Sequence, residues 1–457
     1  MIQTTLKNNR AKSLEYSIKD GTAFSVMTGF GEQYFSPFAI ELGAGNTEIG
    51  LLASVPQFAA SIFQLWTSKT TAFFKSRKKT ILIFVMLQAL TWIPLALIAF
   101  YAPIHGVYLL IALVCLYFIF GQFAGPAWNS LIGDLVNEDS RGRFFGMRNR
   151  ITGTSAFISL LIAGYALSVF SKVDIFYGYA LIFAVAFVAR LVSWHYLNKT
   201  EDPPTIPERL GGFSYAGYLK RLRKTNYGRF ALYFALMNFS VNVAAPFFTV
   251  YMLRDLGMSY LDYTLITASS ALTSFLAMAY WGPIADRFGN KKILSFSGIT
   301  LTLVPLFWLF SADVAYLILA QLVSGFFWAG FNLSSLNFVY DNVKPAKRTR
   351  VFAYHNVLTG TSIFLGALTG SMLAATLTTP AVFSSSLQTL FLISGLMRAA
   401  ASLFFLPRIR EKRDVEYITS RDFFIKYGGT GPIMGLTYGT VIGLHRTLKK
   451  IKKDKLT

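Results

Sequence analysis

Residues 141–155 of the chain read RGRFFGMRNRITGTS, and residues 348–362 read RTRVFAYHNVLTGTS. Both stretches have an Asn followed three residues later by Thr-Gly-Thr-Ser, and each follows an apolar segment that carries an Ala-Gly pair and then a Ser-Leu pair. Because the stretches lie about 200 residues apart in a chain of 457, the sequence consists of two copies of one module. A repeat of half the chain is longer than the roughly 20 to 50 residues of a solenoid repeat, and is typical of transport proteins built from two related halves.

The composition places the chain in a membrane. Hydrophobic residues make up 54% of it and charged residues 14%, whereas about a quarter of the residues in a soluble domain are charged. The net charge of +21 does not indicate nucleic-acid binding, because the basic residues lie in short loops between apolar runs. A single cysteine, Cys115, excludes a disulfide framework. The first 20 residues are polar and basic, so no cleavable signal peptide is expected.

Motifs of common enzymes are missing from the sequence. It has no Gly-x-x-x-x-Gly-Lys-Ser/Thr nucleotide loop, no His-Glu-x-x-His and no Gly-x-Ser-x-Gly, and it has only four His. We therefore expect no catalytic residue, no metal site, no cofactor and no ATP-driven transport by this chain alone.

Twelve apolar runs follow one another along the chain, each about 20 residues long, the length that crosses about 30 Å of hydrocarbon as a helix. They do not alternate polar and apolar residues, as strands of a membrane barrel would. The sequence therefore predicts an all-α membrane protein with twelve transmembrane helices in two pseudo-symmetric six-helix bundles. The runs lie near residues 22–42, 48–68, 80–101, 106–132, 149–170, 174–197, 229–253, 260–284, 291–311, 313–337, 351–376 and 384–406.

Lysine and arginine are distributed unevenly among the loops. Residues 43–47 and 377–385 contain none, whereas the loops on the other side and both termini are rich in them. Since short basic loops stay in the cytoplasm, both termini are predicted to be cytoplasmic, in a cell membrane whose inner leaflet carries anionic lipids. The predicted regions are a cytoplasmic N-terminus (1–20), a first bundle (21–197), a cytoplasmic linker (198–228), a second bundle (229–407) and a basic cytoplasmic tail (408–457).

The linker and the tail each leave two interpretations open. The linker mixes apolar with basic residues, which favours a helix lying on the inner leaflet over a solvated connection. In the tail, Gly435, Gly439 and Gly443 have a spacing that lets helices approach closely. A membrane span there would place the lysines after residue 448 outside, so we expect a short helix on the cytoplasmic face.

Residues 281–294, between the eighth and ninth runs, read WGPIADRFGNKKIL. This stretch resembles the Gly-x-x-x-Asp-Arg-x-Gly-x-Lys/Arg-Lys/Arg loop signature of the major facilitator superfamily. With the twelve spans and two halves, the chain is similar to that superfamily over residues 20–407. The matching first-half loop, residues 66–79, keeps the basic end but lacks the Gly and the Asp. The resemblance implies transport without naming the solute, because the fold serves many substrates.

The resemblance also implies that the first, fourth, seventh and tenth spans face a central cavity. Amides, hydroxyls and aromatic rings dominate the polar residues of these spans, and such a lining suits a polyhydroxy or mixed polar and apolar organic solute. The alternative is that these side chains bond neighbouring helices. The candidates are Gln33, Tyr34, Gln122, Trp128, Asn129, Asn238, Asn242, Trp328, Asn332 and Asn337.

Glu32 is the one carboxylate near the middle of a predicted span. A charge is costly at that depth, so Glu32 should be protonated, pair with a partner or face water. These are properties of a proton-coupling site, and the alternative is a neutral glutamate bonded within a helix contact.

The loop signature implies a cytoplasmic gate. The two-half symmetry of the family places Asp286 across from the start of the fifth span, where unpaired N–H groups attract an anion. The alternative is that Asp286 only shapes its own turn with Arg287 and Gly289. The basic residues expected at the gate are Arg141, Arg143 and Arg148, with a weak or absent reciprocal contact at Arg348 and Arg350.

Two further arginines, Arg190 in the sixth span and Arg398 in the twelfth, occupy matching positions about two turns from the cytoplasmic ends. We expect both to extend to the lipid headgroups of the inner leaflet.

These features predict a secondary active transporter that moves a small organic solute by alternating access, either coupled to protons or as a uniporter. The alternatives are a transporter-like sensor or scaffold, and efflux of amphipathic compounds. The expected partners are a small-molecule substrate, membrane lipids and protons, with no nucleic acid, and the chain is expected to be a monomer.

Overall fold

The computed structural model describes residues 2–101, 105–136, 141–203, 214–344, 348–380, 382–419, 422–423 and 427. No described residue lies in a strand, and each of the twelve predicted spans is helical over most of its length. The all-α fold class is therefore confirmed. Nine of the described helices are long and apolar enough to cross a membrane; the first and ninth predicted spans are interrupted by turns, and the eighth is rich in Ser, Thr and Tyr.

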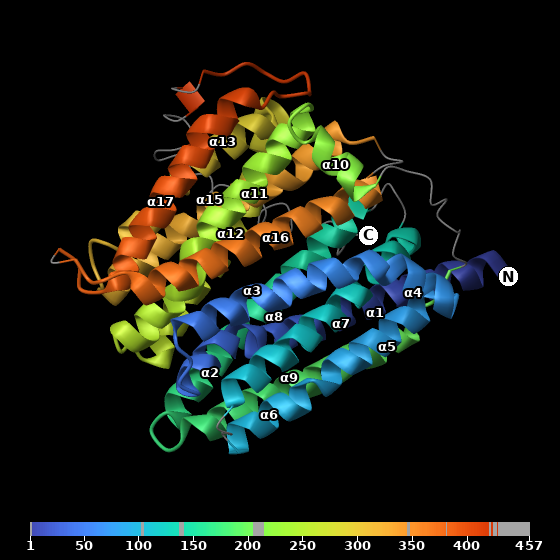
Figure 1. Cartoon of the computed structure of the whole chain (residues 1–457). Helices are drawn as coiled ribbons and strands as arrows, with labels where there is room; N and C mark the ends of the chain where they lie inside the picture. Colours follow the sequence, from blue (N-terminus) through green and yellow to red (C-terminus); the bar gives the residue numbers. More distant parts are fainter. Residues whose placement is uncertain are drawn as a thin grey trace, which may run out of the picture. The chain divides into compact units, whose positions relative to one another are not determined.

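The helices of the first half cover the predicted spans (Figure 1), although the first helix already begins at Ile2. They are α1 (Ile2–Phe30), α2 (Phe35–Glu41), α3 (Asn46–Phe63), α4 (Thr67–Phe74), α5 (Arg77–Leu90), α6 (Trp92–Tyr101), α7 (Gly106–Leu135), α8 (Arg141–Phe170) and α9 (Ile175–Lys199).

The linker contributes one short helix, and the second half repeats the pattern of the first. These helices are α10 (Tyr215–Arg221), α11 (Asn226–Val250), α12 (Tyr260–Phe288), α13 (Asn290–Thr300), α14 (Val304–Phe307), α15 (Val314–Asn342), α16 (Arg348–Thr376) and α17 (Ser386–Phe405). A π-helical turn, Tyr251–Asp255, continues α11.

Short polar side chains cap the N-terminal ends of several of these helices. Asp174 accepts a hydrogen bond from the backbone N–H of Phe176 at the start of α9, and Asp313 accepts one from Tyr316 at the start of α15. Such caps satisfy N–H groups that have no partner inside the helix. The boundaries of both spans are thus encoded locally.

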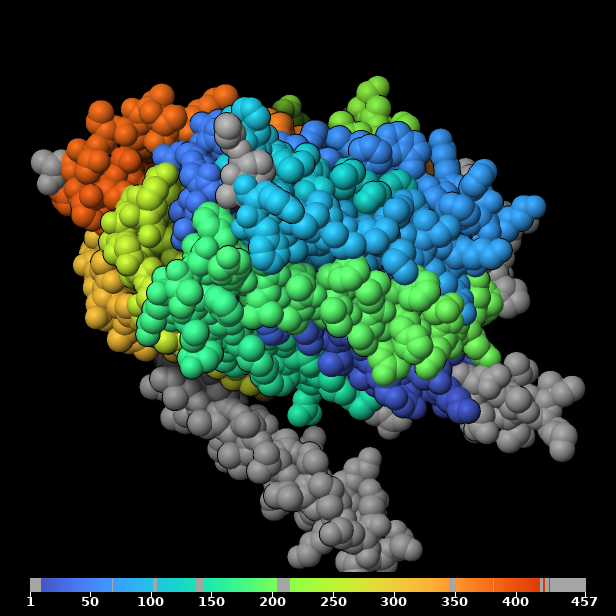
Figure 2. All heavy atoms as spheres, turned by 90° about the horizontal axis from the view of Figure 1, so that it is seen from below, coloured from blue at the N-terminus to red at the C-terminus, as the bar shows by residue number. Residues whose placement is uncertain are grey.

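The first-half helices pack around one another as a bundle. α1 packs against α8 and α9, α5 against α7 and α9, and α3 against α7. The close approach of α1 to α8 requires Gly29, because a side chain at this position would collide with the backbone of Ala156 and with Ser159. Figure 2 shows the outer face of this half, where α6 and α9 lie side by side. Both helices expose apolar side chains, among them Leu97 and Leu181, as helices in contact with lipid do.

The described chain forms two compact units. The larger comprises Met1–Tyr215, Asn238–Ala268 and Thr349–Ser394, and the smaller comprises Ala216–Met237, Ser269–Arg348 and Gly395–Thr457. The larger unit therefore holds the whole first half together with parts of α11, α12, α16 and α17.

The linker is partly helical, as the prediction of a linker helix requires. In α10, Tyr218 is buried, and Leu222 just after it is buried as well. The position of this linker helix on the inner leaflet stays a prediction. The tail segment with Gly435, Gly439 and Gly443 lies outside the described residues.

Candidate transport site

The first predicted span is interrupted at residues 31–34, where the chain makes a 3₁₀ turn between α1 and α2. Pro37 contributes to the interruption, because a proline has no N–H to donate to the carbonyl four residues earlier. That carbonyl, of Gln33, accepts a hydrogen bond from the hydroxyl of Tyr263 at 3.3 Å. The turn contains three consecutive residues that the sequence predicts for the site, residues 32–34.

Glu32 lies in this turn beside an aromatic cluster. The hydroxyl of Tyr117, on α7, donates a hydrogen bond to the carboxylate of Glu32. The ring of Trp92 lies 5.1 Å from that of Tyr117 and 5.4 Å from that of Phe35, measured between centroids. Both Trp92 and Tyr117 are fully buried. One side of the Glu32 carboxylate therefore faces a medium that solvates charge poorly.

The two residues that follow Glu32 point in different directions. Tyr34 is fully buried, and its hydroxyl donates to the backbone oxygen of Leu160 at 2.8 Å and lies 3.1 Å from Oγ1 of Thr264. It thus joins α8 and α12, which is the helix-contact role considered above. The side chain of Gln33 is exposed.

The cavity candidates on α7 differ in their surroundings. Gln122 is partly buried, and Asn129 is exposed. The ring of Trp128 lies beneath the guanidinium of Arg148, whose Cζ is 4.4 Å from the ring centroid. Trp128 is therefore part of a cationic site that the sequence did not indicate.

The cavity candidates of the second half belong to both units. Asn238 and Asn242 lie in the larger unit, where the side chain of Asn242 donates to the backbone oxygen of Asn238 at 2.8 Å. Trp328, Asn332 and Asn337 lie in the smaller unit, and of these Asn332 is exposed. A cavity shared by all the candidates stays a prediction.

A buried ionic cluster lies inside the first half. Asp20 of α1 is 3% exposed, and its carboxylate accepts a 2.6 Å hydrogen bond from Oγ of Ser193 on α9. The same Ser193 oxygen accepts a 2.9 Å bond from the guanidinium of Arg190. On the other side, Arg148 of α8 lies 3.9 Å from the Asp20 carboxylate and donates to the backbone oxygen of Ser17. We call these four residues, Asp20, Arg148, Arg190 and Ser193, the ionic cluster.

Sequence reasoning missed the ionic cluster because it counted Asp20 among the residues outside the membrane. α1 already begins at Ile2, so Asp20 lies well inside a continuous helix that packs on α8 and α9. A signal was present, since Asp20 is the last carboxylate before an apolar run and Arg190 lies within another.

The expectation that Arg190 and Arg398 reach lipid headgroups is wrong. They are 5% and 2% exposed, respectively. Arg190 has the partners described above and also lies over the ring of Phe24, 4.8 Å from its centroid. Arg398 donates to the backbone oxygen of Leu301 at 3.2 Å. Both side chains are held in the interior by bonds to neighbouring segments, so tertiary contacts override the tendency to extend to the lipid headgroups.

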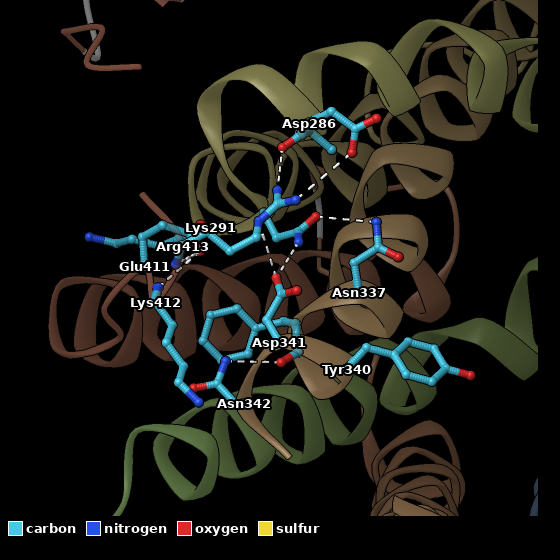
Figure 3. A network of polar contacts seen from close by, with 12 residues as sticks. Asp286, Lys291, Asn337, Tyr340, Asp341, Asn342, Glu411, Lys412 and Arg413 are labelled. Carbon is cyan, nitrogen blue, oxygen red and sulfur yellow. Dashed lines mark hydrogen bonds and ion pairs between the residues drawn. The ribbon is translucent and has the colours of Figure 1, made fainter. Parts of the chain in front are cut away.

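The gate residues of the second-half loop contact the tail (Figure 3). The guanidinium of Arg413 lies 3.9 Å from the carboxylate of Asp286, whose side chain is 81% exposed, and 3.5 Å from that of Asp341 on α15. Arg413 also donates to the backbone oxygen of Ala285 at 2.5 Å. The neighbouring Arg287 forms a 2.7 Å ion pair with Glu416. The tail thus supplies partners that the sequence did not predict.

Gly289 shapes the turn between α12 and α13. Its φ of +87° is a conformation that residues with a side chain rarely adopt. A side chain there would also collide with the carboxylate of Glu411, which accepts a 2.8 Å hydrogen bond from the backbone N–H of Lys291. Beside this turn, Asn290 donates to Asp341 at 2.7 Å and accepts from Asn337 at 3.3 Å.

The basic residues predicted for the gate have different surroundings in the structure. Arg148 belongs to the ionic cluster. Arg348 donates to the backbone oxygens of Tyr340 and Val343, both at 3.1 Å, and so stabilises the end of α15. The backbone of Arg141 and Arg143 belongs to α8, but their side chains lie outside the described part of the chain, and Arg350 is partly buried. A contact of Asp286 with the start of α8 stays a prediction.

Two pockets among the described residues lie at the tail rather than at the predicted cavity. The first has a volume of about 240 Å³ and is lined by residues of α12, α13 and the tail, including Lys292 and Tyr417. The second, of about 400 Å³, lies between the start of α11 and the tail. Neither is lined by a residue that the sequence predicts for the solute.

Comparison with known proteins identifies the family. The family model of the Major Facilitator Superfamily matches residues 22–250 and 230–422. The Quinolone resistance protein NorA of Staphylococcus aureus (strain MRSA252) is 25% identical over 148 residues, which is 32% of this chain and 38% of that protein. The alignment thus spans well under half of that relative.

Solved structures share the fold. A mutant form of the nucleoside transporter NupG has a TM-score of 0.67 at 16% identity, covering 87% of this chain and 100% of that one. A D-xylose–proton symporter has a TM-score of 0.68 at 14% identity, covering 89% and 99%. With its apolar helices, this chain is a multi-pass membrane protein for transmembrane transport, and it belongs to the Major Facilitator Superfamily.

Proposed function

We propose that the chain is a secondary active transporter that moves a small organic solute by alternating access of its two halves, with Glu32 as the proton-coupling residue. The observation that carries the proposal is the hydrogen bond between Tyr117 and Glu32 in the break of the first span. A carboxylate at this depth is charged only at a cost in free energy, so exchange of a proton between it and water is favoured when the site opens.

The helix break supports this role. A continuous helix would hold residue 32 by its backbone, whereas a single 3₁₀ turn flanked by Gly31 and Pro37 leaves this segment free to rotate between helical pieces. The ring of Trp92 fills the space beside Gly31, so a side chain at this position would collide with the ring.

The substrate class follows from the candidate side chains. Amides such as Gln33 and Asn332 are exposed, and Trp328 is partly buried, so donors, acceptors and an aromatic ring are present among the candidates. Such groups suit a polyhydroxy or heteroaromatic compound of modest size. The nucleoside and D-xylose transporters that share the fold agree with this class.

Two alternatives make different predictions. The short match to NorA, a quinolone resistance protein, favours export of an amphipathic compound. A sensor or scaffold would bind a solute without moving it. We place the protein in the cell membrane as a monomer with both termini in the cytoplasm, since the basic loops favour that orientation.

Proteoliposomes that contain the full chain and a trapped pH-sensitive dye separate these functions. Uridine, D-xylose and a quinolone are added in turn, and both solute uptake and internal pH are recorded. We expect one solute class to enter together with protons. Glu32→Gln should abolish solute-driven proton movement while exchange of labelled solute across the membrane continues, because exchange needs no net proton release.

The matched control is Glu48→Gln, which removes a carboxylate in the first turn of α3, at the end of a span rather than near its middle. This variant should keep coupled transport. Uptake without proton movement in the wild type would make the protein a uniporter, outward movement of the quinolone alone would favour the efflux alternative, and binding without flux of any solute would identify a sensor.

A further inference from the structure

The loops that join the second and third spans of the two halves differ in one side chain. In the first half, Arg77 begins α5 and is 4% exposed. Its guanidinium forms a 2.6 Å ion pair with Asp134 at the end of α7 and donates to the hydroxyl of Ser130 at 3.0 Å. It also donates to the backbone oxygen of Pro203, just after α9, at 3.1 Å. One arginine thus joins the loop, the end of α7 and the segment that follows the sixth span.

The second-half loop has an amide at the matching position. Arg77 is followed by two lysines at the start of α5, and Asn290 is followed by two lysines at the start of α13. In both halves an aspartate is the last residue but one of the helix of the fourth span, Asp134 in α7 and Asp341 in α15. Asn290 donates one hydrogen bond to Asp341, at 2.7 Å, but brings no positive charge. At this position the second-half loop therefore lacks the arginine that the first-half loop pairs with its aspartate.

The tail supplies an arginine at this place (Figure 3). The guanidinium of Arg413 lies 3.5 Å from the carboxylate of Asp341 and donates to the backbone oxygen of Ala285, near the end of α12. Arg413 thereby joins the end of α15 to the turn between α12 and α13, as Arg77 joins the end of α7 to the start of α5. The two arginines come from different parts of their halves, because Arg77 belongs to the loop itself and Arg413 to the segment after α17.

Contacts on both sides of Arg413 hold the tail in place. On one side, the side chain of Asn226 on α11 donates to the backbone oxygen of Arg410 and accepts from its backbone N–H, both at 2.9 Å. On the other side, Glu416 pairs with the side chain of Arg287 and donates its backbone N–H to the backbone oxygen of Arg287 at 3.1 Å. Both side chains of this pair are more than half exposed, and exposed pairs contribute little free energy. The tail is therefore docked in a defined position by bonds that can be released.

Asp286 stays accessible beside Arg413. Its side chain is 81% exposed, and the carboxylate and the guanidinium are 3.9 Å apart. A pair with this exposure is weak, so the carboxylate can still accept bonds from a second partner. The start of α8 is the partner that the sequence predicts. The contacts of Arg413 with Ala285 and Asp341 fix the helical turn that carries Asp286, and so set the position of its carboxylate.

We propose that Arg413 is a positioning residue for the cytoplasmic gate. It holds the turn between α12 and α13 against the end of α15, with the carboxylate of Asp286 placed to meet its partner when the cytoplasmic side closes. Because this arginine lies on the tail, the gate is strong while the tail is docked and weak once the tail is released. The tail thus regulates the gate. This inference rests on the proposed alternating access and adds the segment that controls it.

The test measures how open the cytoplasmic side is, so it needs no knowledge of the solute. The parent protein is the full chain with Cys115→Ala and Asn238→Cys, and a membrane-impermeant maleimide is added to the cytoplasmic side of membrane vesicles. We expect Arg413→Gln to label about fivefold faster than the parent, the upper end of what a partly exposed ion pair contributes. Adding Asp286→Asn to Arg413→Gln should not raise the rate above that of the faster single variant, because both changes weaken the same contact.

A rescue separates the guanidinium from the tail as a whole. Asn290→Arg gives the second-half loop the residue that the first-half loop has, and together with Arg413→Gln it should return the labelling rate to that of the parent. Arg413→Lys, which keeps the charge, should label more slowly than Arg413→Gln, and it carries the test if Asn290→Arg fails to fold at its buried position. The matched control is Lys412→Gln, which removes an exposed positive charge next to Arg413 and should label like the parent.

Each variant is first checked for a single elution peak and the melting profile of the parent. A parent-like rate in Arg413→Gln, an equal rise in Lys412→Gln, or a rise that neither Asn290→Arg nor Arg413→Lys reduces would overturn the inference. Movement of a solute together with protons by the wild type would still support the proposed function in that case. The expected labelling pattern in a chain that moves no solute in proteoliposomes would support the inference and reject transport as the function.

Discussion

Arg190 and Arg398 occupy matching positions in the two halves, and both are buried, but their partners differ. Arg190 bonds Ser193, which in turn bonds the carboxylate of Asp20. Arg398 donates to the backbone carbonyl of Leu301. The first arginine is thus part of a network of charges, whereas the second satisfies a group of the main chain. The arginine is thus present in both copies of the module, but its partner differs between them.

The sequence of the second half explains why Arg398 bonds the carbonyl of Leu301. Pro305 has no N–H, so the carbonyl of Leu301, four residues earlier, has no donor from its own helix. A buried carbonyl without a donor is costly, and the Arg398 guanidinium reaches it at 3.2 Å. The break between α13 and α14 falls at this point. Arg398 therefore bonds a backbone carbonyl where the neighbouring segment is broken by a proline. Arg190 instead belongs to a cluster of charges, because the neighbouring helix carries a carboxylate.

The largest effect on the stability of the protein is expected at Asp20. Asp20→Asn removes the carboxylate at nearly constant size and leaves Arg148 and Arg190 without their shared anion. Breaking a buried ionic network costs about 3 to 5 kcal/mol, so thermal unfolding of the purified protein should occur at a clearly lower temperature. Asp20→Glu should lose less, because the charge is retained. Identical melting of the wild type and Asp20→Asn would show that the cluster does not stabilise the first half.

A smaller effect is expected at Arg398, and a double-mutant cycle isolates its cause. Arg398→Leu should reduce the free energy of unfolding by about 1.5 to 3 kcal/mol, the range for a hydrogen bond with a charged donor. In a Pro305→Ala background the loss should be smaller, since the restored N–H can bond the carbonyl of Leu301. Denaturant titrations of the four proteins give the coupling energy. An equal loss in both backgrounds would mean that Arg398 acts through its other contacts.

The smallest effect on stability is expected at Asp286, an exposed carboxylate whose nearest described cation is Arg413 at 3.9 Å. Pairs of this kind contribute between about 0 and 1 kcal/mol, so Asp286→Asn should melt like the wild type. A role of Asp286 in the cytoplasmic gate would be visible in cysteine labelling instead of in stability. If Asp286 closes the cytoplasmic side, the variant should label faster from that side at a cysteine introduced at Asn238, while Asp286→Glu should not. Equal labelling of all three proteins would leave Asp286 with the local role of shaping its turn.

The fold could be predicted because its determinants are local. The length and apolarity of each run require a helix in a bilayer, whatever its neighbours are, and all twelve predicted spans are helical. The signature at residues 281–294 led to the family that the family model confirms. Glu32 could be chosen for the same kind of reason, because the depth of a carboxylate within an apolar run is visible in the sequence.

The sequence alone determined the helices, the duplication and the family, since each of these depends on composition and spacing along the chain. Only the tertiary structure decided which side chains meet. It brought Tyr117 to Glu32, buried Asp20 between two arginines, and placed Arg413 of the tail beside Asp286. These contacts join residues far apart in the chain. Their energies depend on burial and distance, which no pattern of spacing contains.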